Sequence, residues 1–327
     1  LICTYNLLYP EPLKIDSRIP AYHRLKELNG SLIINDSPLC RLWATDFSRI
    51  YPAVKITFSS PITSTDQAVN SLINNKSDLV WLGPDLQKYQ EELFLKSKGE
   101  IPTMTPVAFG GARTHGNKPA IAIFVNENNP ISRASLQELD AIFSDSRKSG
   151  YKNPIKVWGD LGLSGPWKKI PIKCIGMSIN NQSGVPHGWV YFLMNHMLFV
   201  GTFRNDLIQI PDTAYGPGAN RAFVKIIDMI KNDKTAIGFA PLEYKQNGVK
   251  NLLISKDQNS TYYDINEKTI TEGNYPLSQI KTLAYLKNNS NRVVLEFLKF
   301  CTSKEGQSLV LQDPEKSLPI PYSSINR

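Results

Sequence analysis

Histidine and cysteine are the side chains of this sequence best suited to metal binding or nucleophilic chemistry, and their spacing favours neither. No two of them form a Cys-x-x-Cys pair or a zinc-ligand pattern. The sequence has no Walker A motif and no nucleophile elbow, and a catalytic triad would have to combine residues far apart in the chain. We therefore expect no metal, no cofactor and no enzymatic activity. The residues concerned are His23, His115, His187, His196, Cys3, Cys40, Cys174 and Cys301.

The cysteines also bear on the compartment. Their even number is compatible with disulfides in an oxidising compartment, and four cysteines allow three pairings among which the sequence does not choose. Buried free thiols are the alternative. The segment Leu1-Ile2-Cys3 is faintly similar to the end of a lipoprotein signal, although Ile is a poor residue before a lipid-modified Cys.

Length, hydropathy and charge restrict the class of protein. The chain has 327 residues, which suggests about two domains, and no apolar run approaches the ~18 residues that cross a bilayer. The net charge is +8, but the basic residues are scattered, as on a solvated surface, so we expect no nucleic-acid partner. The first residue is Leu, which is compatible with a trimmed, secreted chain. We expect a soluble protein without a membrane span.

Strand-like and helix-like patterns alternate along the chain, which indicates parallel α/β layers. A cap-like Asn-Asp-Ser-Pro cluster precedes the first helical pattern, and Ser132 or Ser135 could cap a later one. The predicted strands are 31–34, 54–58, 77–82, 104–109, 120–125, 170–176, 236–240, 252–254 and 280–286. The predicted helices are 39–50, 65–74, 91–98, 135–143, 187–200, 220–232, 293–301 and 307–311.

Six short motifs follow one another in a fixed order. They are Tyr51-Pro-Ala-Val-Lys-Ile56, Val125-Asn-Glu-Asn-Asn-Pro130, Ile142-Phe-Ser144 with Trp158-Gly-Asp-Leu-Gly162, Ala236-Ile-Gly238, Tyr275-Pro-Leu277 and Glu305-Gly-Gln307. Each motif alone is weak, but the set resembles the PstS-like phosphate-binding proteins of ABC transporters. The motifs mark fold and packing more than they mark a ligand.

The resemblance implies a type II periplasmic-binding-protein fold, in which two α/β lobes are joined by a two-strand hinge. The first lobe would hold residues 1–118, with an N-terminal arm at 1–28, together with residues 242–327. The second lobe would hold residues 119–241. The resemblance further implies a monomeric clamp in the periplasm or at the cell surface that captures phosphate or a similar small anion for an ABC permease.

The resemblance also implies how the anion is held. Backbone N–H groups at helix starts, Ser or Thr hydroxyl groups and an Arg side chain would surround it. This chain departs from that pattern at Pro38, which lacks an N–H group, at Met177, where relatives carry Arg, and at Val185, where they carry Thr. Asp85 would be a displaced ligand-facing carboxylate or a simple turn residue. The remaining candidates for ligand contact are Ser37, Thr63, Ser64, Ser183, Gly184 and His187, of which His187 could supply a positive charge below neutral pH.

Three functions stay open from the sequence. The first is capture of a phosphate-like oxyanion, and the second is a divergent clamp that has lost phosphate and binds another ligand or a protein or surface partner. The third, a phosphatase-like hydrolase, has no residue that singles it out. Other segments that could reach the cleft are Arg113 and His115, the glycine-rich run 215–220, and Trp189, which could favour a larger or less charged ligand.

Overall fold

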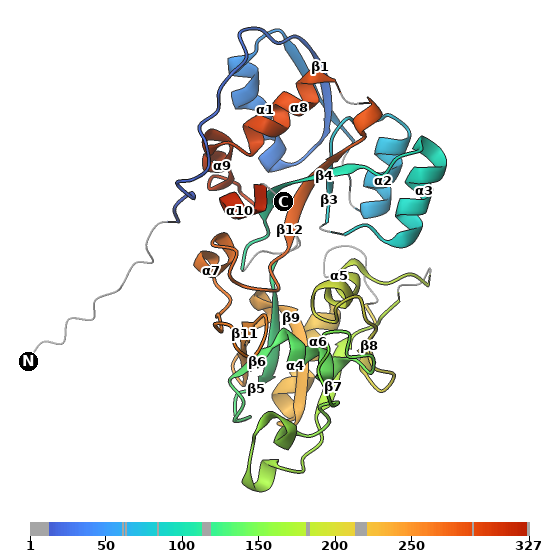
Figure 1. Ribbon diagram of the computed structural model, residues 1–327, viewed down its shortest axis with the longest axis vertical. Coiled ribbons are helices and arrows are strands. Elements are labelled where there is room, and N and C mark those ends of the chain that lie inside the picture. Colours follow the sequence, from blue (N-terminus) through green and yellow to red (C-terminus); the bar gives the residue numbers. More distant parts are fainter. Residues whose placement is uncertain are drawn as a thin grey trace, which may run out of the picture.

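The computed structural model describes residues 13–60, 62, 64–83, 85–112, 119–180, 184–212, 221–289 and 291–325. It has two α/β lobes, one above the other in Figure 1, with the strands β4 and β12 of the upper lobe leading to the lower one. The predicted type II periplasmic-binding-protein fold is confirmed. No helix among these residues is long and apolar enough to cross a membrane.

The first lobe contains two small sheets. Strands β1 and β2 form a parallel pair, and β12 lies between β3 and β4 and is antiparallel to both. The strands are β1 (Gly30–Asn35), β2 (Val54–Ser59), β3 (Val80–Leu82), β4 (Thr103–Phe109) and β12 (Ile280–Tyr285). The helices are α1 (Pro38–Ile50), α2 (Thr65–Ile73), α3 (Lys88–Lys98), α8 (Arg292–Cys301), α9 (Lys304–Val310) and α10 (Tyr322–Ile325), with a short 3-10 turn at Lys287–Asn289.

Aromatic side chains fill the core of the first lobe where α1 meets α8. Phe47 packs edge to face on Phe297, with ring centroids 5.2 Å apart. Trp43 is fully buried, and its indole N–H donates to the carbonyl oxygen of Gly306 at 2.8 Å. A Cβ added at Gly306 would lie 2.1 Å from the carbonyl oxygen of Phe300, so no larger residue fits there. The Glu-Gly-Gln motif is therefore a packing motif.

The second lobe is built on a five-stranded sheet in the order β10-β5-β9-β7-β8, with β6 and β11 paired beside it. The strands are β5 (Ile121–Asn126), β6 (Arg133–Ser135), β7 (Lys173–Met177), β8 (Ile208–Ile210), β9 (Ala236–Pro241), β10 (Val249–Asn251) and β11 (Leu253–Ser255). The helices are α4 (Leu136–Phe143), α5 (Gly188–His196), α6 (Arg221–Asn232) and α7 (Glu267–Thr271), with 3-10 turns at Trp158–Leu161, Gly165–Trp167 and Leu242–Tyr244.

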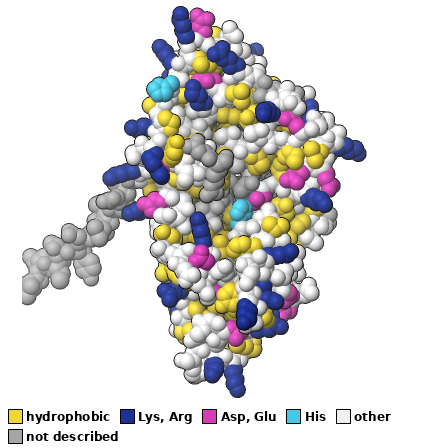
Figure 2. All heavy atoms as spheres, in the orientation of Figure 1, with side chains coloured by type: hydrophobic (Ala, Val, Ile, Leu, Met, Phe, Trp, Pro, Cys, Tyr) yellow, Lys and Arg dark blue, Asp and Glu magenta, His cyan; other side chains and the backbone are white. Residues whose placement is uncertain are grey.

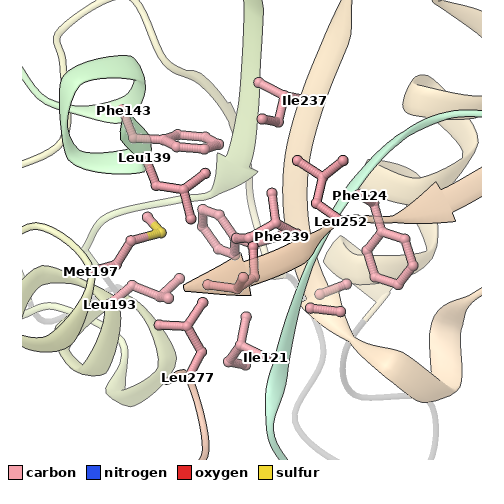
Figure 3. Packing of buried hydrophobic residues seen from close by; sticks show 14 of the residues in the cluster. Ile121, Phe124, Leu139, Phe143, Leu193, Met197, Ile237, Phe239, Leu252 and Leu277 are labelled. Atoms are coloured by element: carbon pink, nitrogen blue, oxygen red, sulfur yellow. The ribbon is translucent and has the colours of Figure 1, made fainter. Parts of the chain in front are cut away.

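Two adjacent strands of this sheet, β5 and β9, are completely buried. Every residue of β5 and β9 is buried, as their continuous apolar sequences indicate for strands covered on both faces. Figure 3 shows Phe239 of β9 among side chains of α4 and α5, including Phe143 and Leu193. The α5 helix is thus anchored in the second lobe by its apolar face.

Several predicted boundaries are confirmed and others differ. The strands predicted over 77–82 and 170–176 are Val80–Leu82 and Lys173–Met177, and the helices predicted over 91–98 and 307–311 begin earlier, at Lys88 and Lys304. Ser135 caps α4 in a capping box with Glu138, as one of the two predicted candidates. The helix predicted over 187–200 ends at residue 196, because Phe199 and Val200 both have positive φ angles that a helix does not allow.

Two strands that follow residue 241 belong to sheets of the second lobe. Residues 249–251 pair with β5 and residues 253–255 pair with β6, both in the second lobe. The strand pairing therefore favours a boundary beyond residue 241.

Replacing Gly238 by Ala should destabilise the second lobe. An added Cβ would lie 2.7 Å from the carbonyl oxygen of Ile175 on the neighbouring strand, so β9 and β7 would have to separate. Overpacking of this kind costs about 1–3 kcal/mol. Gly188→Ala is the matched control, because its Cβ would meet nothing within 4 Å. Urea unfolding should show a lower free energy of unfolding for Gly238→Ala alone, and equal values for the two variants would contradict this packing.

Candidate functional site

Three helix starts form the candidate site. The α1 and α2 helices belong to the first lobe, and α5 lies on the side of the second lobe that faces the first (Figure 1). The first N–H groups of a helix have no intrahelical acceptor and carry a partial positive charge, so they are natural donors to an oxyanion.

Ser37 caps α1, and its hydroxyl group can still donate one hydrogen bond. Its Oγ accepts hydrogen bonds from the backbone N–H of Cys40 at 3.2 Å and from the indole N–H of Trp81 at 2.8 Å. A hydroxyl oxygen has two acceptor sites and one proton, so Ser37 is left as a donor. Pro38 follows at the first helical position and supplies no N–H group, as the sequence indicated. No local sequence pattern indicates the contact between Trp81 and Ser37.

Ser64 caps α2 in the same way, because its Oγ accepts from the backbone N–H of Gln67 at 3.2 Å. The first turn of α2 also holds Asp66, whose carboxylate accepts from Tyr89 Oη at 2.6 Å and from Gln90 Nε2 at 2.7 Å. These two hydrogen bonds offset part of the repulsion that a negative charge at this position would exert on an anion. The predicted contact Thr63 lies outside the described residues.

The α5 helix starts without a side-chain cap. Its N-cap residue is His187, whose side chain accepts no hydrogen bond from the first turn. Gly184, three residues earlier, has a φ angle of +78°, a conformation that glycine adopts without strain. The first N–H groups of α5 are therefore not used by a side-chain cap. Ser183 lies outside the described residues.

His187 is half-buried, and this affects its charge. Burial lowers the pKa of His187, while the nearby carboxylate of Asp212 raises it by a smaller amount. His187 is therefore mostly neutral at neutral pH, and it does not replace the missing Arg as a cation there.

Met177 is a core residue and not a surface residue. It is the last residue of β7, it is 1% exposed, and it belongs to the hydrophobic core of the second lobe. The position at which relatives would carry Arg is thus filled by a core side chain. Trp189 likewise packs edge to face on Phe223, with centroids 5.6 Å apart, so its ring is at least partly a core element.

A buried lysine supplies a positive charge in the first lobe. Lys281 of β12 is 4% exposed and donates to Ser317 Oγ at 2.7 Å. Burial lowers the pKa of Lys281 to about 8, with Asp313 and Glu315 acting in the opposite direction, so the amine remains mostly protonated at pH 7. Cys40 in the first turn of α1 is among its electrostatic neighbours. No motif or spacing in the sequence marks this residue.

Asp85 makes a contact that neither of its two predicted roles includes. Its Oδ2 lies 2.8 Å from Nε2 of His196 at the end of α5, so its carboxylate connects the two lobes. Two further contacts join the same parts, from Tyr191 to the backbone of Leu86 and from Gln87 to the backbone of Pro186. These partners are about a hundred residues apart, and no local pattern reveals such pairs.

Among the residues that the structure describes, the remaining chemistry-bearing side chains form no second centre. Within the described ranges, no group of three or more His, Cys, Asp and Glu side chains could hold a metal ion. Cys40, Cys174 and Cys301 are buried free thiols, and burial raises the pKa of Cys40 and of Cys174 to about 12. Cys3, Arg113, His115 and the run 215–220 lie outside the described residues.

Charged side chains on the visible face do not gather at one place. Figure 2 shows Lys and Arg spread over both lobes of this face, with Asp and Glu among them. The predicted scatter of basic residues is confirmed there, and it differs from the continuous stripe of a nucleic-acid-binding surface.

Comparison with known proteins places this chain in a family. Phosphate-binding protein PstS of Pseudomonas aeruginosa is 30% identical over 313 residues, which cover 93% of this chain and 88% of that protein. The same values hold for PstS of a second strain. The chain belongs to the PstS family of phosphate-binding proteins. No protein-family model matches the sequence.

Solved structures agree with the PstS family at the level of the fold. PstS from Borrelia burgdorferi has a TM-score of 0.55 at 19% identity, and it covers 89% of this chain and 99% of its own. An ABC-type phosphate transport receptor from Vibrio cholerae has a TM-score of 0.50 at 14% identity, and it covers 88% of this chain and 98% of its own.

Stability should depend on pH through His187. Because burial lowers its pKa in the folded state, the unfolded chain takes up the proton at a higher pH than the folded chain does. The free energy of unfolding should therefore fall as the pH drops through about 6.5, the ordinary value for histidine. His187→Gln should make that fall smaller, as measured by urea unfolding between pH 8 and pH 5. Identical pH profiles for the variant and the parent would contradict this assignment.

Proposed function

We propose that this chain is an extracytoplasmic solute-binding protein that captures phosphate or a similar small oxyanion between its two lobes for an ABC importer. The observation that carries the proposal is the relation to Pseudomonas aeruginosa PstS over nearly the whole chain. The three helix starts of α1, α2 and α5 support it, because they provide donors from both lobes.

In this proposal the contacts come from hydroxyl and backbone groups. Ser37 donates its hydroxyl proton, Ser64 and Thr63 contribute at α2, and Ser183, Gly184 and the first N–H groups of α5 approach from the second lobe. His187 contributes as a neutral side chain near neutral pH. Binding then depends on hydrogen bonds and helix dipoles instead of a guanidinium group, which favours a small oxyanion with several acceptor oxygens.

The wider setting follows from the same proposal. The protein would act as a monomer in the periplasm or at the cell surface, hand its ligand to a membrane permease and catalyse no reaction. The second lobe would extend to about Leu277, whose backbone oxygen accepts from the N–H of Ile121, and the first lobe would resume at β12.

A second candidate function is favoured by the residues that replace the family pattern. Met177 lies in the core and Pro38 offers no N–H group, so the donor set is smaller than the resemblance implies. A chain with too few donors would leave a buried anion unpaired, which is costly. The alternative is a clamp of the same fold that binds a less charged ligand or a protein or surface partner.

Calorimetry with inorganic phosphate separates the two functions. The protein is refolded and dialysed free of ligand, and phosphate is titrated at low salt. We expect binding in the micromolar range or tighter. Hydrogen bonds to charged groups contribute about 1.5–3 kcal/mol, so Ser37→Ala should weaken binding by about tenfold or more.

A matched control keeps loss of a helix cap apart from loss of a ligand contact. Ser303 caps α9, so Ser303→Ala removes the same kind of cap there and should lower stability with little effect on affinity. Absence of heat and of any thermal shift with the parent protein between pH 5 and pH 8 would rule out phosphate and support the second candidate.

A further inference from the structure

Three consecutive residues of the first lobe contact α5 and the residue just before its cap. Asp85 Oδ2 lies 2.8 Å from His196 Nε2, Tyr191 Oη donates to the carbonyl oxygen of Leu86 at 3.2 Å, and Gln87 Nε2 donates to the carbonyl oxygen of Pro186 at 3.0 Å. The contacts run the full length of α5, from before its start to its last residue. We call this set of contacts the interlobe latch.

Each side of the interlobe latch is fixed within its own lobe. On the first lobe, the N–H of Gln87 donates to Gln90 Oε1 at 3.0 Å, and Gln90 Nε2 donates to Asp66 in the first turn of α2. The chain of hydrogen bonds therefore continues from α5 through α3 to the start of α2. A shift of α5 would disturb a helix start of the candidate site directly.

On the second lobe, the ring of His196 is held by its own helix. It stacks on Phe192, with centroids 4.6 Å apart and an angle of 27° between the planes. Phe192 is 3% exposed and belongs to the core of this lobe, so the imidazole points to Asp85 from a supported position. The His196 side chain is 40% exposed and that of Asp85 21%, so the pair is reachable by water and this contact contributes little by itself.

None of these side chains needs to touch a ligand to affect its binding. A clamp binds with an apparent affinity reduced by the fraction of molecules in the binding-competent arrangement. Contacts that exist only when the lobes approach each other increase that fraction, and an already closed clamp loses less freedom on binding. This matters most where ligand contacts are few, as in a site without its Arg.

We propose that the interlobe latch of Asp85, Leu86 and Gln87 with α5 sets ligand affinity by holding the start of α5 against the first lobe. The identity of the ligand in this inference rests on the proposed function. The closed arrangement of the lobes does not. The side chains of the latch are then positioning residues that act through α5, namely Asp85, His196, Gln87 and Tyr191.

The test combines phosphate calorimetry with small-angle X-ray scattering of the ligand-free protein. The variants are Asp85→Ala, His196→Ala, their double variant, and Tyr191→Phe, which removes only a hydroxyl group. Each single variant should weaken phosphate binding about threefold, and the double Asp85/His196 variant should be no weaker than its single members, because one contact is lost in each. Ligand-free variants should have a larger radius of gyration than the parent.

Two controls keep the outcome unambiguous. His23→Ala removes an exposed histidine of the first lobe and should change neither the affinity nor the radius of gyration. His196→Gln replaces the alanine variant if the latter does not fold, as judged by thermal unfolding.

The outcomes separate the two proposals. If the parent binds phosphate and all variants bind equally well, the interlobe latch is excluded while the proposed function stands. If the parent binds no phosphate, the proposed function fails, and scattering alone decides the latch. A larger radius of gyration in the variants would then support it, and an unchanged one would overturn it.

Discussion

The position of α5 against the first lobe is the constraint on which the candidate site depends. An anion withdrawn from water needs donors on all sides, and the candidate donors of the described residues come from both lobes. Among the described residues, the first lobe offers the starts of α1 and α2, and the second offers the start of α5, which has no side-chain cap. The apolar face of α5 is packed in the core of its own lobe, while Tyr191 and His196 reach the other lobe.

The departures from the family pattern affect side chains more than backbone. Pro38 removes one N–H group and Met177 places a thioether in the core, but the helix starts themselves are kept. Donors supplied by a helix start depend little on side-chain type, so they survive substitutions that remove an Arg. What is lost is a fixed, fully charged group. Lys281 is a buried positive charge of the first lobe, and Cys40 in the first turn of α1 is among its electrostatic neighbours.

The alternation of strands and helices could be predicted from the sequence because its signals are local, whereas the two-lobe fold could be predicted only through the resemblance of the six motifs. The continuous apolar runs of β5 and β9 and the capping box at Ser135 each depend on neighbouring residues. Only the packing explains why the motifs contain glycine. A Cβ at Gly159 would lie 2.2 Å from the carbonyl oxygen of Lys168.

The site could be predicted only in part. Ser37 could be predicted as part of a helix cap, because a hydroxyl residue before an apolar helical pattern is a local signal, whereas Ser64 is a candidate only by its place in the family pattern and its role as a cap is seen in the structure. The role of Asp85 could not be predicted, because its partner His196 is 111 residues away and no short motif connects them. Met177 was expected at the cleft by its place in the family pattern, whereas β7 carries it into the core. Contacts between the lobes depend on how the two folded lobes pack against each other. The hydrophobic periodicity of the sequence does not predict this packing.

A crystal structure of the protein grown with phosphate tests the central claim most directly, because it locates the ligand as well as detecting it. We predict tetrahedral density between the two lobes, within hydrogen-bond distance of Ser37 Oγ and of the first N–H groups of α5. Density at another place on the molecule, or an empty cleft at saturating phosphate, would contradict an anion site built from these helix starts.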